Sequence, residues 1–185
     1  MESAESVPGT QLLQDDVAAI ERGLPRPSTG ALYAAGRRPC AVELGDLDGD
    51  LDVDIATTDE LDNTVSILFN AGDGTFAPRI TYPVGQMPRS LKIADLDGDL
   101  DLDLVVLNTV SHDVSILLNN GDGMFAPEAR VFVGNVTQRG EPNLNFQNPG
   151  PFLAVGDLDG DGDIDVAVDG QSVVQVKRKH RRVDL

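Results

Sequence analysis

Three short segments of the chain carry aspartate at every second position. They span Asp46–Asp54, Asp95–Asp103 and Asp157–Asp165, and together they hold fifteen of the 31 acidic residues. The acids of the three segments are Asp46, Asp48, Asp50, Asp52, Asp54, Asp95, Asp97, Asp99, Asp101, Asp103, Asp157, Asp159, Asp161, Asp163 and Asp165. An acidic surface that serves only solubility would spread its charges more evenly, so this clustering indicates a specific role.

The spacing of these carboxylates suits a loop that curls around a cation. Side chains two residues apart on an extended chain point the same way, and the glycine at position 4, Gly98 in the second loop, allows a tight curl. Two carboxylates about 4 Å apart repel by roughly 4 kcal/mol at an effective dielectric near 20, so several converge only around a positive charge. Oxygen ligands without His or Cys select a hard cation, and a flexible loop rich in carboxylates favours Ca²⁺ over Mg²⁺. We therefore expect about three calcium ions, one for each loop.

Two other interpretations of the acidic loops fit less well. A single Asp-x-Asp-Gly-Asp run is compatible with a solvated turn, but three copies at the same place in a repeat argue against it. An EF-hand needs Gly at position 6 and Glu at position 12. Position 12 is Thr57, Val106 or Val168 in this chain, so a short loop closed by Asp at position 9, with a strand on each side, fits better.

The loops belong to an internal repeat with a period of 49 residues. Of the 40 positions from Asp46 to Gly85, 21 are identical one period later. The third copy begins at Asp157, which is 62 residues after Asp95 and therefore 13 more than the period. The additional residues fall in Asn135–Gly150, a stretch rich in Asn, Gly, Pro and Gln that we expect to be a surface loop.

Short apolar runs of strand length surround each loop. In the second repeat they are Leu91–Ile93, Leu104–Leu107, Val114–Leu118 and Phe125–Val133. Residues Asn119–Gly123 predict a tight hairpin between the last two runs, and we expect Asp73 and Asp122 to form such turns rather than to bind metal. Four antiparallel strands in a period near 50 predict a blade of a β-propeller, with a solenoid of stacked hairpins as the alternative.

Several motifs together resemble the FG-GAP/VCBS repeats, the calcium-bearing propeller blades of integrin α-subunit heads and many secreted bacterial proteins. They are the Asp-x-Asp-Gly-Asp-x-x-x-Asp loop, the Gly-Asp-Gly-x-Phe-Ala-Pro stretch and the Val-Gly before the next blade, and they cover residues 31–170. The resemblance implies an all-β fold of four-stranded antiparallel blades. It also implies calcium coordination by the side chains at positions 1, 3, 5 and 9 and by the backbone carbonyl at position 7. The carboxylates at position 7, Asp52, Asp101 and Asp163, would then stay in solvent.

The resemblance carries expectations about function as well. It implies an extracellular or cell-surface protein in which calcium stabilises the blades, and which serves as a scaffold for adhesion or interaction. Position 6 departs from the family pattern, because Leu51 and Leu100 stand where glycine is common and only Gly162 keeps it. If this position needs a positive φ, we expect some strain and weaker binding in the first two loops.

The repeats divide the chain into three parts. Residues 1–30 form an N-terminal arm and linker, in which 10–23 match a short helix. Residues 31–170 hold blades around 37–85, 86–134 and 150–170, the last one incomplete, and residues 171–185 form a basic tail. Since a closed propeller takes about four to eight blades, we expect an open, partial propeller with exposed strand edges, through which copies can self-associate.

Composition excludes several classes of partner. A formal net charge of −17 argues against nucleic acid, because phosphate binding needs a basic footprint. No apolar run approaches the roughly 20 residues of a membrane helix, so we expect no membrane insertion. The N-terminus shows no signal-peptide pattern, and the single cysteine, Cys40, excludes an intrachain disulfide. We expect Cys40 to be a small residue packed at the start of a strand.

We do not expect an enzyme. The sequence lacks a nucleophile motif, a phosphate-binding loop and a metal-binding histidine pair. His112 falls in a turn and His180 in the basic tail, so both are expected to be solvated. Some calcium propellers of secreted proteins belong to lectins or polysaccharide lyases, which leaves carbohydrate binding, or an accessory role in polysaccharide degradation, as the alternative. The blade-connecting loops would then carry the protein or carbohydrate ligands.

Overall fold

The computed structural model describes residues 32–134, 153–169 and 174–177, and this part of the chain consists of β-strands joined by turns and loops. The first sheet contains, in order, β1 (Pro39–Gly45), β2 (Asp54–Asp59), β3 (Thr64–Leu68) and β4 (Ile80–Pro83). The second contains β5 (Pro88–Ala94), β6 (Asp103–Asn108), β7 (Asp113–Leu117) and β8 (Ala129–Phe132). The third contains β9 (Leu153–Gly156), β10 (Asp165–Asp169) and β11 (Val174–Lys177), with β10 in the middle.

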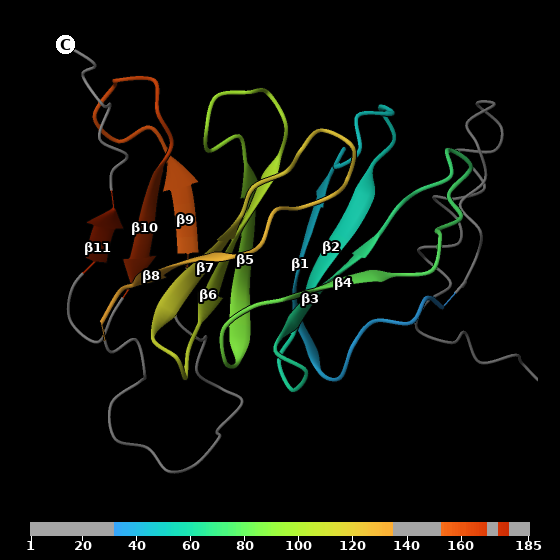
Figure 1. Cartoon of the computed structure of the whole chain (residues 1–185), viewed down its shortest axis with the longest axis horizontal. Coiled ribbons are helices and arrows are strands. Elements are labelled where there is room, and N and C mark those ends of the chain that lie inside the picture. Colours follow the sequence, from blue (N-terminus) through green and yellow to red (C-terminus); the bar gives the residue numbers. More distant parts are fainter. Residues whose placement is uncertain (1–31, 135–152, 170–173, 178–185) are drawn as a thin grey trace, which may run out of the picture.

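The architecture confirms an all-β fold of antiparallel propeller blades, one blade for each repeat (Figure 1). The first two blades share their strand register, since Ile55 lies opposite Leu68 as Leu104 lies opposite Leu117 one period later. Both also shift register near the start of the first strand, after Pro39 and after Pro88. The helix expected at residues 10–23 and the surface loop expected at 135–150 lie outside the described residues.

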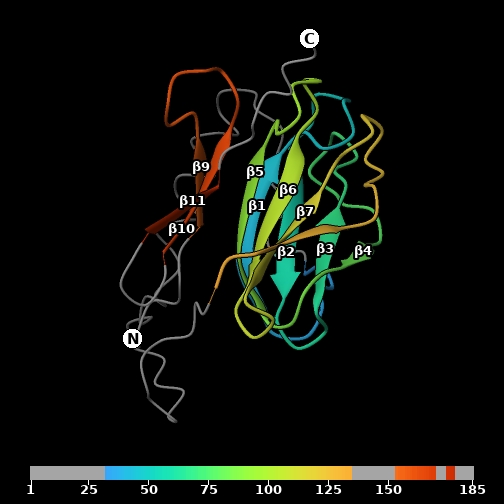
Figure 2. The ribbon, with the colours of Figure 1, turned by 60° about the vertical axis from the view of Figure 1, so that its left-hand side comes forward.

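The alternation of side chains along the strands builds two cores between the blades. In β6, Leu104 and Val106 point to one face and pack toward the first blade, whereas Val105 and Leu107 point to the other face. All six residues of β6 are buried, because this strand lies in the middle of the three-blade stack (Figure 2). The core between the first two blades comprises Leu47, Ala56, Val65, Ile67, Val84, Leu91, Leu104, Val106, Leu117 and Phe125. The core toward the third blade comprises Leu96, Val105, Leu107, Val114, Val133, Leu153, Val166 and Val168.

The tight turn between the third and fourth strands of a blade has the predicted form. In the second blade Asn119 bridges to Phe125, and Gly121 and Gly123 have φ of 83° and 74°. Asp122 accepts the Met124 N–H with Oδ1, so its side chain belongs to the turn, as expected. Asp73 accepts the Thr75 N–H in the same way in the first blade.

Regular structure in the third blade continues past residue 170. Strand β11 pairs antiparallel with β10, and Val166 lies opposite Lys177. β11 therefore begins within the segment 171–185 that the sequence suggested to be a basic tail. The repeat alignment would place residue 179 opposite Val166, so the β10–β11 hairpin is two residues shorter than its counterpart in the second blade.

Candidate metal centres

The three acidic loops occupy the same place in the three blades. Each joins the first strand of a sheet to the second, between β1 and β2, β5 and β6, or β9 and β10, and all three project from the same end of the molecule (Figure 1). A strand enters and leaves every loop, which is the environment that the sequence predicted and which an EF-hand lacks.

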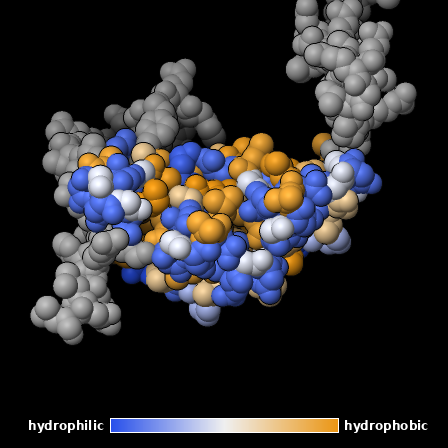
Figure 3. Space-filling model, turned by 90° about the horizontal axis from the view of Figure 1, so that it is seen from above, coloured by the Kyte–Doolittle hydropathy of each residue, from blue (hydrophilic) through white to orange (hydrophobic). Residues whose placement is uncertain are grey.

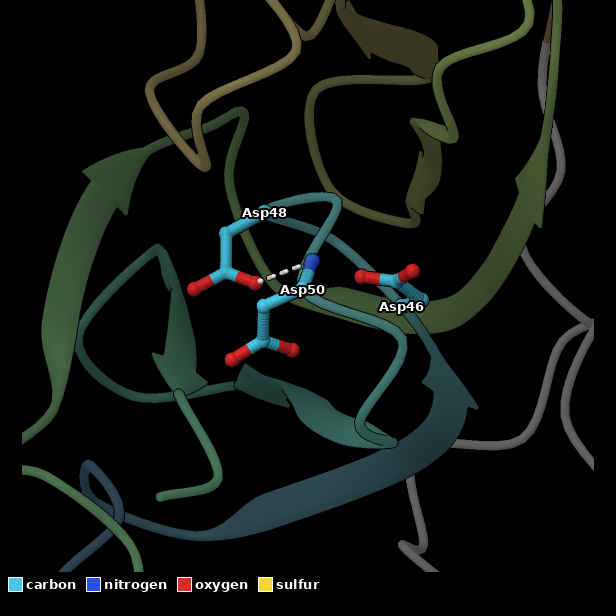
Figure 4. A group of neighbouring side chains, drawn as sticks. All are labelled: Asp46, Asp48 and Asp50. Atoms are coloured by element: carbon cyan, nitrogen blue, oxygen red, sulfur yellow. Dashed lines mark hydrogen bonds between the residues drawn. The ribbon is translucent and has the colours of Figure 1, made fainter. Parts of the chain in front are cut away.

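Each loop gathers three carboxylates to within metal-binding reach of one another. In the first loop, one oxygen from each of Asp46, Asp48 and Asp50 lies within 4.8 Å of the other two, and Figure 4 shows the carboxylates of Asp48 and Asp50 side by side with that of Asp46 across the loop. The equivalent groups are Asp95, Asp97 and Asp99 in the second loop and Asp157, Asp159 and Asp165 in the third. Positions 1 and 3 thus take part in all three groups, position 5 in two and position 9 in one.

The aspartate at position 1 also holds the curl of its loop. The two carboxylate oxygens of Asp46 accept the N–H groups of Gly49 at 2.8 Å and Leu51 at 3.0 Å. Asp95 and Asp157 make the same pair of hydrogen bonds to positions 4 and 6 of their own loops. A carboxylate oxygen has two lone pairs, so these bonds leave room for a metal ligand.

The curl requires left-handed backbone at two positions. Position 4 is glycine in all three loops, which predicted the tight curl, and its φ is 80°, 83° and 79°. At position 6, φ is 73° at Leu51, 80° at Leu100 and 88° at Gly162. Position 6 therefore does need a positive φ, and two leucines adopt a conformation that disfavours a side chain.

The two leucines at position 6 also point into solvent. Leu51 is 89% exposed and Leu100 is 87% exposed. Figure 3 shows the loop end of the molecule, where apolar surface lies among the hydrophilic loop residues. Packing therefore does not explain why leucine stands at these positions.

The aspartate at position 9 ties its loop to the rest of the blade in the first two repeats. Asp54 is fully buried, and its two oxygens accept the N–H groups of Leu47 and Asn70, each at 2.8 Å. Asp103 does the same with Leu96 and Asn119. Position 9 thus has a structural role in addition to the expected ligand role, which spacing alone did not reveal.

The aspartate at position 7, expected to keep its carboxylate in solvent, is partly covered in the first two loops. Asp52 and Asp101 are half-buried, since each lies against the first glycine of a Gly-Asp-Gly turn. A Cβ at Gly72 would lie 2.7 Å from Asp52 Oδ2, and one at Gly121 would lie 2.5 Å from Asp101 Oδ2. The turn between the third and fourth strands folds over the acidic loop, and this close approach excludes any residue with a side chain.

The electrostatics of the first two loops disfavour their ionised forms. Burial raises the pKa of Asp54, with the charges of Asp50 and Asp46 adding to the effect and two backbone N–H groups opposing it. Burial likewise raises the pKa of Asp48, and the nearby carboxylates add to it against the Asp50 N–H. The pKa of Asp103 is raised for the same reasons. A cation among these groups would remove the repulsion, so the donor set fits a hard divalent ion.

The third loop differs from the first two in its electrostatics and exposure. The pKa of Asp157 is lowered, first by the N–H groups of Gly160 and Gly162. Its neighbours are more exposed than those of the other loops, except for Asp165, which is 3% exposed and accepts the Leu158 N–H. This loop makes the same position-1 hydrogen bonds as the other two loops, but no fourth blade covers it within the described residues.

Sequence reasoning missed one cluster of charged side chains altogether. Glu60 is 1% exposed and lies between the first two blades, where it pairs with Arg38 at 3.1 Å and with Arg89 at 2.8 Å. Cys40 donates its thiol hydrogen to Glu60 at 3.0 Å. Cys40 does lie at the start of β1, as expected, but it is exposed rather than packed. Single residues of common types carry no periodic signal that would have indicated this cluster.

The histidine in the described region sits at a structural position. His112 is half-buried and has a φ of 55°, like Asn63 one period earlier with 56°. It thus occupies the left-handed site of a turn between strands. His180 lies outside the described residues. No helix in the described part of the chain is long and apolar enough to cross a membrane.

Comparison with known proteins agrees with this description of the blades. The family model of the FG-GAP-like repeat matches residues 46–106 and again residues 95–168. The two matches start on the first and second acidic loops, and together they span most of the chain. No curated protein matches the chain.

Three solved structures resemble part of the chain. The Tc holotoxin pore of Photorhabdus luminescens has a TM-score of 0.46 and 22% identity, over 75% of this chain and 6% of that chain. The TcdB2-TccC3 structure without its hypervariable C-terminal region has a TM-score of 0.44 and 22% identity, over 78% of this chain and 6% of that one. An Agrocybe aegerita lectin that recognises non-reducing terminal N-acetylglucosamine has a TM-score of 0.46 and 23% identity, over 76% and 38%. The chain thus spans well under two thirds of each of these structures.

Proposed function

The chain belongs to the family of FG-GAP-like repeats, and from this premise we propose that its acidic loops bind calcium and that the bound ions stabilise the propeller blades. The observation that supports the proposal is the convergence of three carboxylates, to within 4.8 Å, at the same place in all three blades. Oxygen donors of this charge suit a hard cation, and loops of this flexibility suit calcium. The raised pKa of Asp48 and Asp54 agrees with a site that lacks sufficient positive charge of its own.

Calcium would act on the blade as a whole rather than on the loop alone. Asp54 and Asp103 connect each loop to the turn between the third and fourth strands. Asp52 and Asp101 lie against the same turns. An ion that fixes the loop would therefore also fix the far side of its sheet, so its binding free energy adds to the stability of the fold.

We propose a non-catalytic role for these blades, as an extracellular scaffold for interaction. The carboxylates gathered in the three acidic loops repeat regularly, which suits ion binding rather than acid–base chemistry. Extracellular calcium modules have dissociation constants of about 10⁻⁴–10⁻³ M, which is compatible with exposed loops that carry strain at position 6. Depolymerisation of a polysaccharide by the purified protein would contradict the non-catalytic role.

Removal of calcium tests the central proposal. We expect each ion, at 100 times its dissociation constant, to stabilise the fold by roughly 2.7 kcal/mol. For a chain of this size that corresponds to a decrease in Tm of roughly 5–10 °C for each ion that chelation removes, measured by circular dichroism or calorimetry. Identical melting curves with and without a chelator would sink the proposal.

Substitution at position 3 separates metal binding from folding. Asp48→Asn keeps the oxygen that accepts the Asp50 N–H but removes the charge. We expect this variant, and Asp97→Asn in the second loop, each to lose one calcium ion by titration calorimetry and to show a smaller calcium effect on Tm. Asp73→Asn is the matched control, because Asp73 is an exposed turn residue of the same type. An equal loss of calcium in the control would contradict the assignment of the loops.

A further inference from the structure

The first blade has an apolar face that no other described part of the chain covers. Val42 and Leu44 of β1 are 62% and 63% exposed, and Val53, which precedes β2, is 52% exposed. One period later the same positions are Leu91, Ile93 and Leu102, which pack into the core between the first two blades. The first blade therefore exposes the very face that the second blade buries against its predecessor.

The third blade is exposed on the other side, on the face that would contact a following blade. Leu158, at position 2 of the third loop, is 54% exposed, whereas its counterparts Leu47 and Leu96 are 1% and 9% exposed. Leu47 is buried because the second blade covers it, as its place in the shared core shows. No following blade covers Leu158 in the part of the chain that the structure describes. These two incomplete faces lie at opposite ends of the blade stack (Figure 1).

The two incomplete faces carry the counterparts of residues that pack together inside the chain. Inside the chain, Gly45 of the first blade makes room for two side chains of the second, since a Cβ there would lie 3.0 Å from Leu102 and 3.6 Å from Ile93. The third-blade counterpart of Gly45 is Gly156, where a Cβ would meet no atom within 4 Å. The counterparts of Ile93 and Leu102 are the exposed Leu44 and Val53.

The junction between the second and third blades repeats this arrangement. Ala94, the counterpart of Gly45, packs against the same core as Val155 and Ile164, which are the counterparts of Ile93 and Leu102. The same contact therefore occurs twice within the chain. A third contact of this kind would join Gly156 at one end of the blade stack to Leu44 and Val53 at the other end.

The hydrogen bonds between blades are likewise incomplete at the first blade. Asn119 of the second blade donates to the backbone carbonyl of Leu47 in the first blade at 2.8 Å and to that of Leu102 at 3.1 Å. Asn70, one period earlier, makes only the second kind of bond, to the Val53 carbonyl at 3.1 Å. The carbonyl that would complete the pattern is that of Leu158.

The segment that precedes the first blade runs where an outer strand would lie. Tyr82 of β4 meets Phe125 of the next blade edge-on, with ring centroids 5.3 Å apart. Tyr33, one period earlier, meets Phe76 in the same manner at 5.1 Å. Residues 32–36 thus take the position of the fourth strand of a preceding blade, while the third blade has three strands in the described region.

We propose that two copies of this chain associate head to tail, so that the exposed face of the first blade in each copy packs on the third blade of the other. In each contact Leu44 and Val53 of one copy fill the space at Gly156 of the other, and the segment 32–36 lies beside the β11 edge. A propeller closes with about four to eight blades. The described residues of one copy supply three blades, so two copies supply six, which is within the range that closes a ring, whereas three copies would supply nine.

The association is tested by sedimentation of the full chain in calcium-containing buffer at about 0.15 M salt, which limits repulsion between two copies with a net charge of −17 each. We expect a dimer at micromolar concentration. A folded monomer up to about 100 µM, with dissociation constants of 10⁻⁴ M or weaker, would overturn the proposal.

Two single substitutions each change one side of the proposed interface. Leu44→Glu changes an exposed side chain of the first blade, and Gly156→Glu places a charge in open space on the third blade, so both chains should fold alone. In a head-to-tail ring either variant disrupts both interfaces, and each is expected to be monomeric. Phe132→Glu, on the outer strand of the second blade and 69% exposed, is the matched control and should remain dimeric.

Mixing the two variants provides the decisive measurement. An equimolar mixture of Leu44→Glu and Gly156→Glu retains one intact interface, so we expect it to form an open heterodimer, whereas each variant alone stays monomeric. If the two first blades met face to face instead, Gly156→Glu would remain dimeric and the mixture would show no rescue. That pattern would contradict the head-to-tail arrangement, even though the protein dimerises.

Discussion

Position 6 of the acidic loop shows how the backbone conformation of one residue limits a site. Leu51 and Leu100 have φ of 73° and 80° without any packing that offsets the cost. A left-handed conformation costs a residue with a side chain about 1–2 kcal/mol. Gly162 in the third loop has no such cost, so the three loops are not equivalent in strain although they are nearly identical in sequence.

We predict that Leu51→Gly stabilises the protein. Relief of the backbone strain outweighs the greater flexibility that glycine gives to the unfolded chain, so the expected gain is about 0.5–1 kcal/mol, measured by urea denaturation with calcium present. Leu61→Gly serves as the control, because Leu61 is half-exposed and has no positive φ, and it should lose stability by a similar amount. A loss of stability in Leu51→Gly would show that the leucine has a favourable role in the loop.

At this scale the sequence predicted the three acidic loops and the glycine at position 4. It also raised the question of position 6, because a departure from a repeated pattern is visible without a structure. It did not predict that position 9 is bonded to Asn70 and Asn119, or that position 7 is covered by Gly72 and Gly121. Those contacts join residues 16 to 20 positions apart, and their geometry depends on how the two turns of a blade meet.

At the scale of elements, Glu60 connects the first two blades. It follows β2 of the first blade and accepts hydrogen bonds from Arg89 in β5 of the second blade. Burial opposes the ionisation of Glu60, but the Cys40 thiol, Arg89 and Arg38 outweigh it and hold the pKa of this carboxyl below its ordinary value. Although Cys40 is exposed as a whole, desolvation of its thiol beside Glu60, together with the hydrogen bond to that carboxylate and its charge, raises the pKa of Cys40 to about 11, so this thiol is a hydrogen-bond donor at neutral pH.

We predict that Glu60→Gln destabilises the junction between the blades by about 2–3 kcal/mol, because it leaves two guanidinium groups beside a neutral partner. Since the folded-state pKa is lowered, the stabilisation by Glu60 is present at neutral pH and is lost as the pH falls through that pKa. The variant should therefore lose less stability on acidification than the parent chain, as followed by urea denaturation between pH 7 and about pH 3. The control Glu43→Gln removes a partner of Lys92 in a half-exposed pair and should cost less than about 1 kcal/mol.

The elements themselves were largely predictable. The four apolar runs of the second repeat correspond to strands, and Gly121 and Gly123 supply the expected turn. The sequence did not explain why glycine precedes each blade at Gly36 and Gly85. A Cβ at Gly85 would lie 2.5 Å from the side chains of both Asn108 and Ser111, so the close approach of these side chains requires glycine here.

At the scale of the whole molecule, calcium and protons are expected to compete for the same carboxylates. The pKa values of Asp48, Asp54 and Asp103 are raised in the fold, so in the absence of calcium these groups contribute stability at low pH that is lost as the pH rises. Calcium replaces the protons as the positive partner at higher pH.

We therefore predict that the difference in Tm between the calcium-loaded and the calcium-stripped protein is largest at neutral pH and disappears as these carboxylates become protonated. The contribution of Glu60 is common to both forms and cancels in the difference. Thermal scans of the two forms from about pH 7.5 down to about pH 4 measure it. A pH-independent difference would indicate that the loop carboxylates are not the ligands.

The bond from Asn119 to the Leu47 carbonyl has a consequence for how such chains evolve. It means that the acidic loop of one repeat is completed by the repeat that follows, so a duplicated 49-residue segment brings a contact for its predecessor along with a new loop. A gene can then gain or lose whole periods and still encode complementary neighbours. An insertion of any other length must fall between strands, and the 13 additional residues before the third repeat fall in the sequence between β8 and β9.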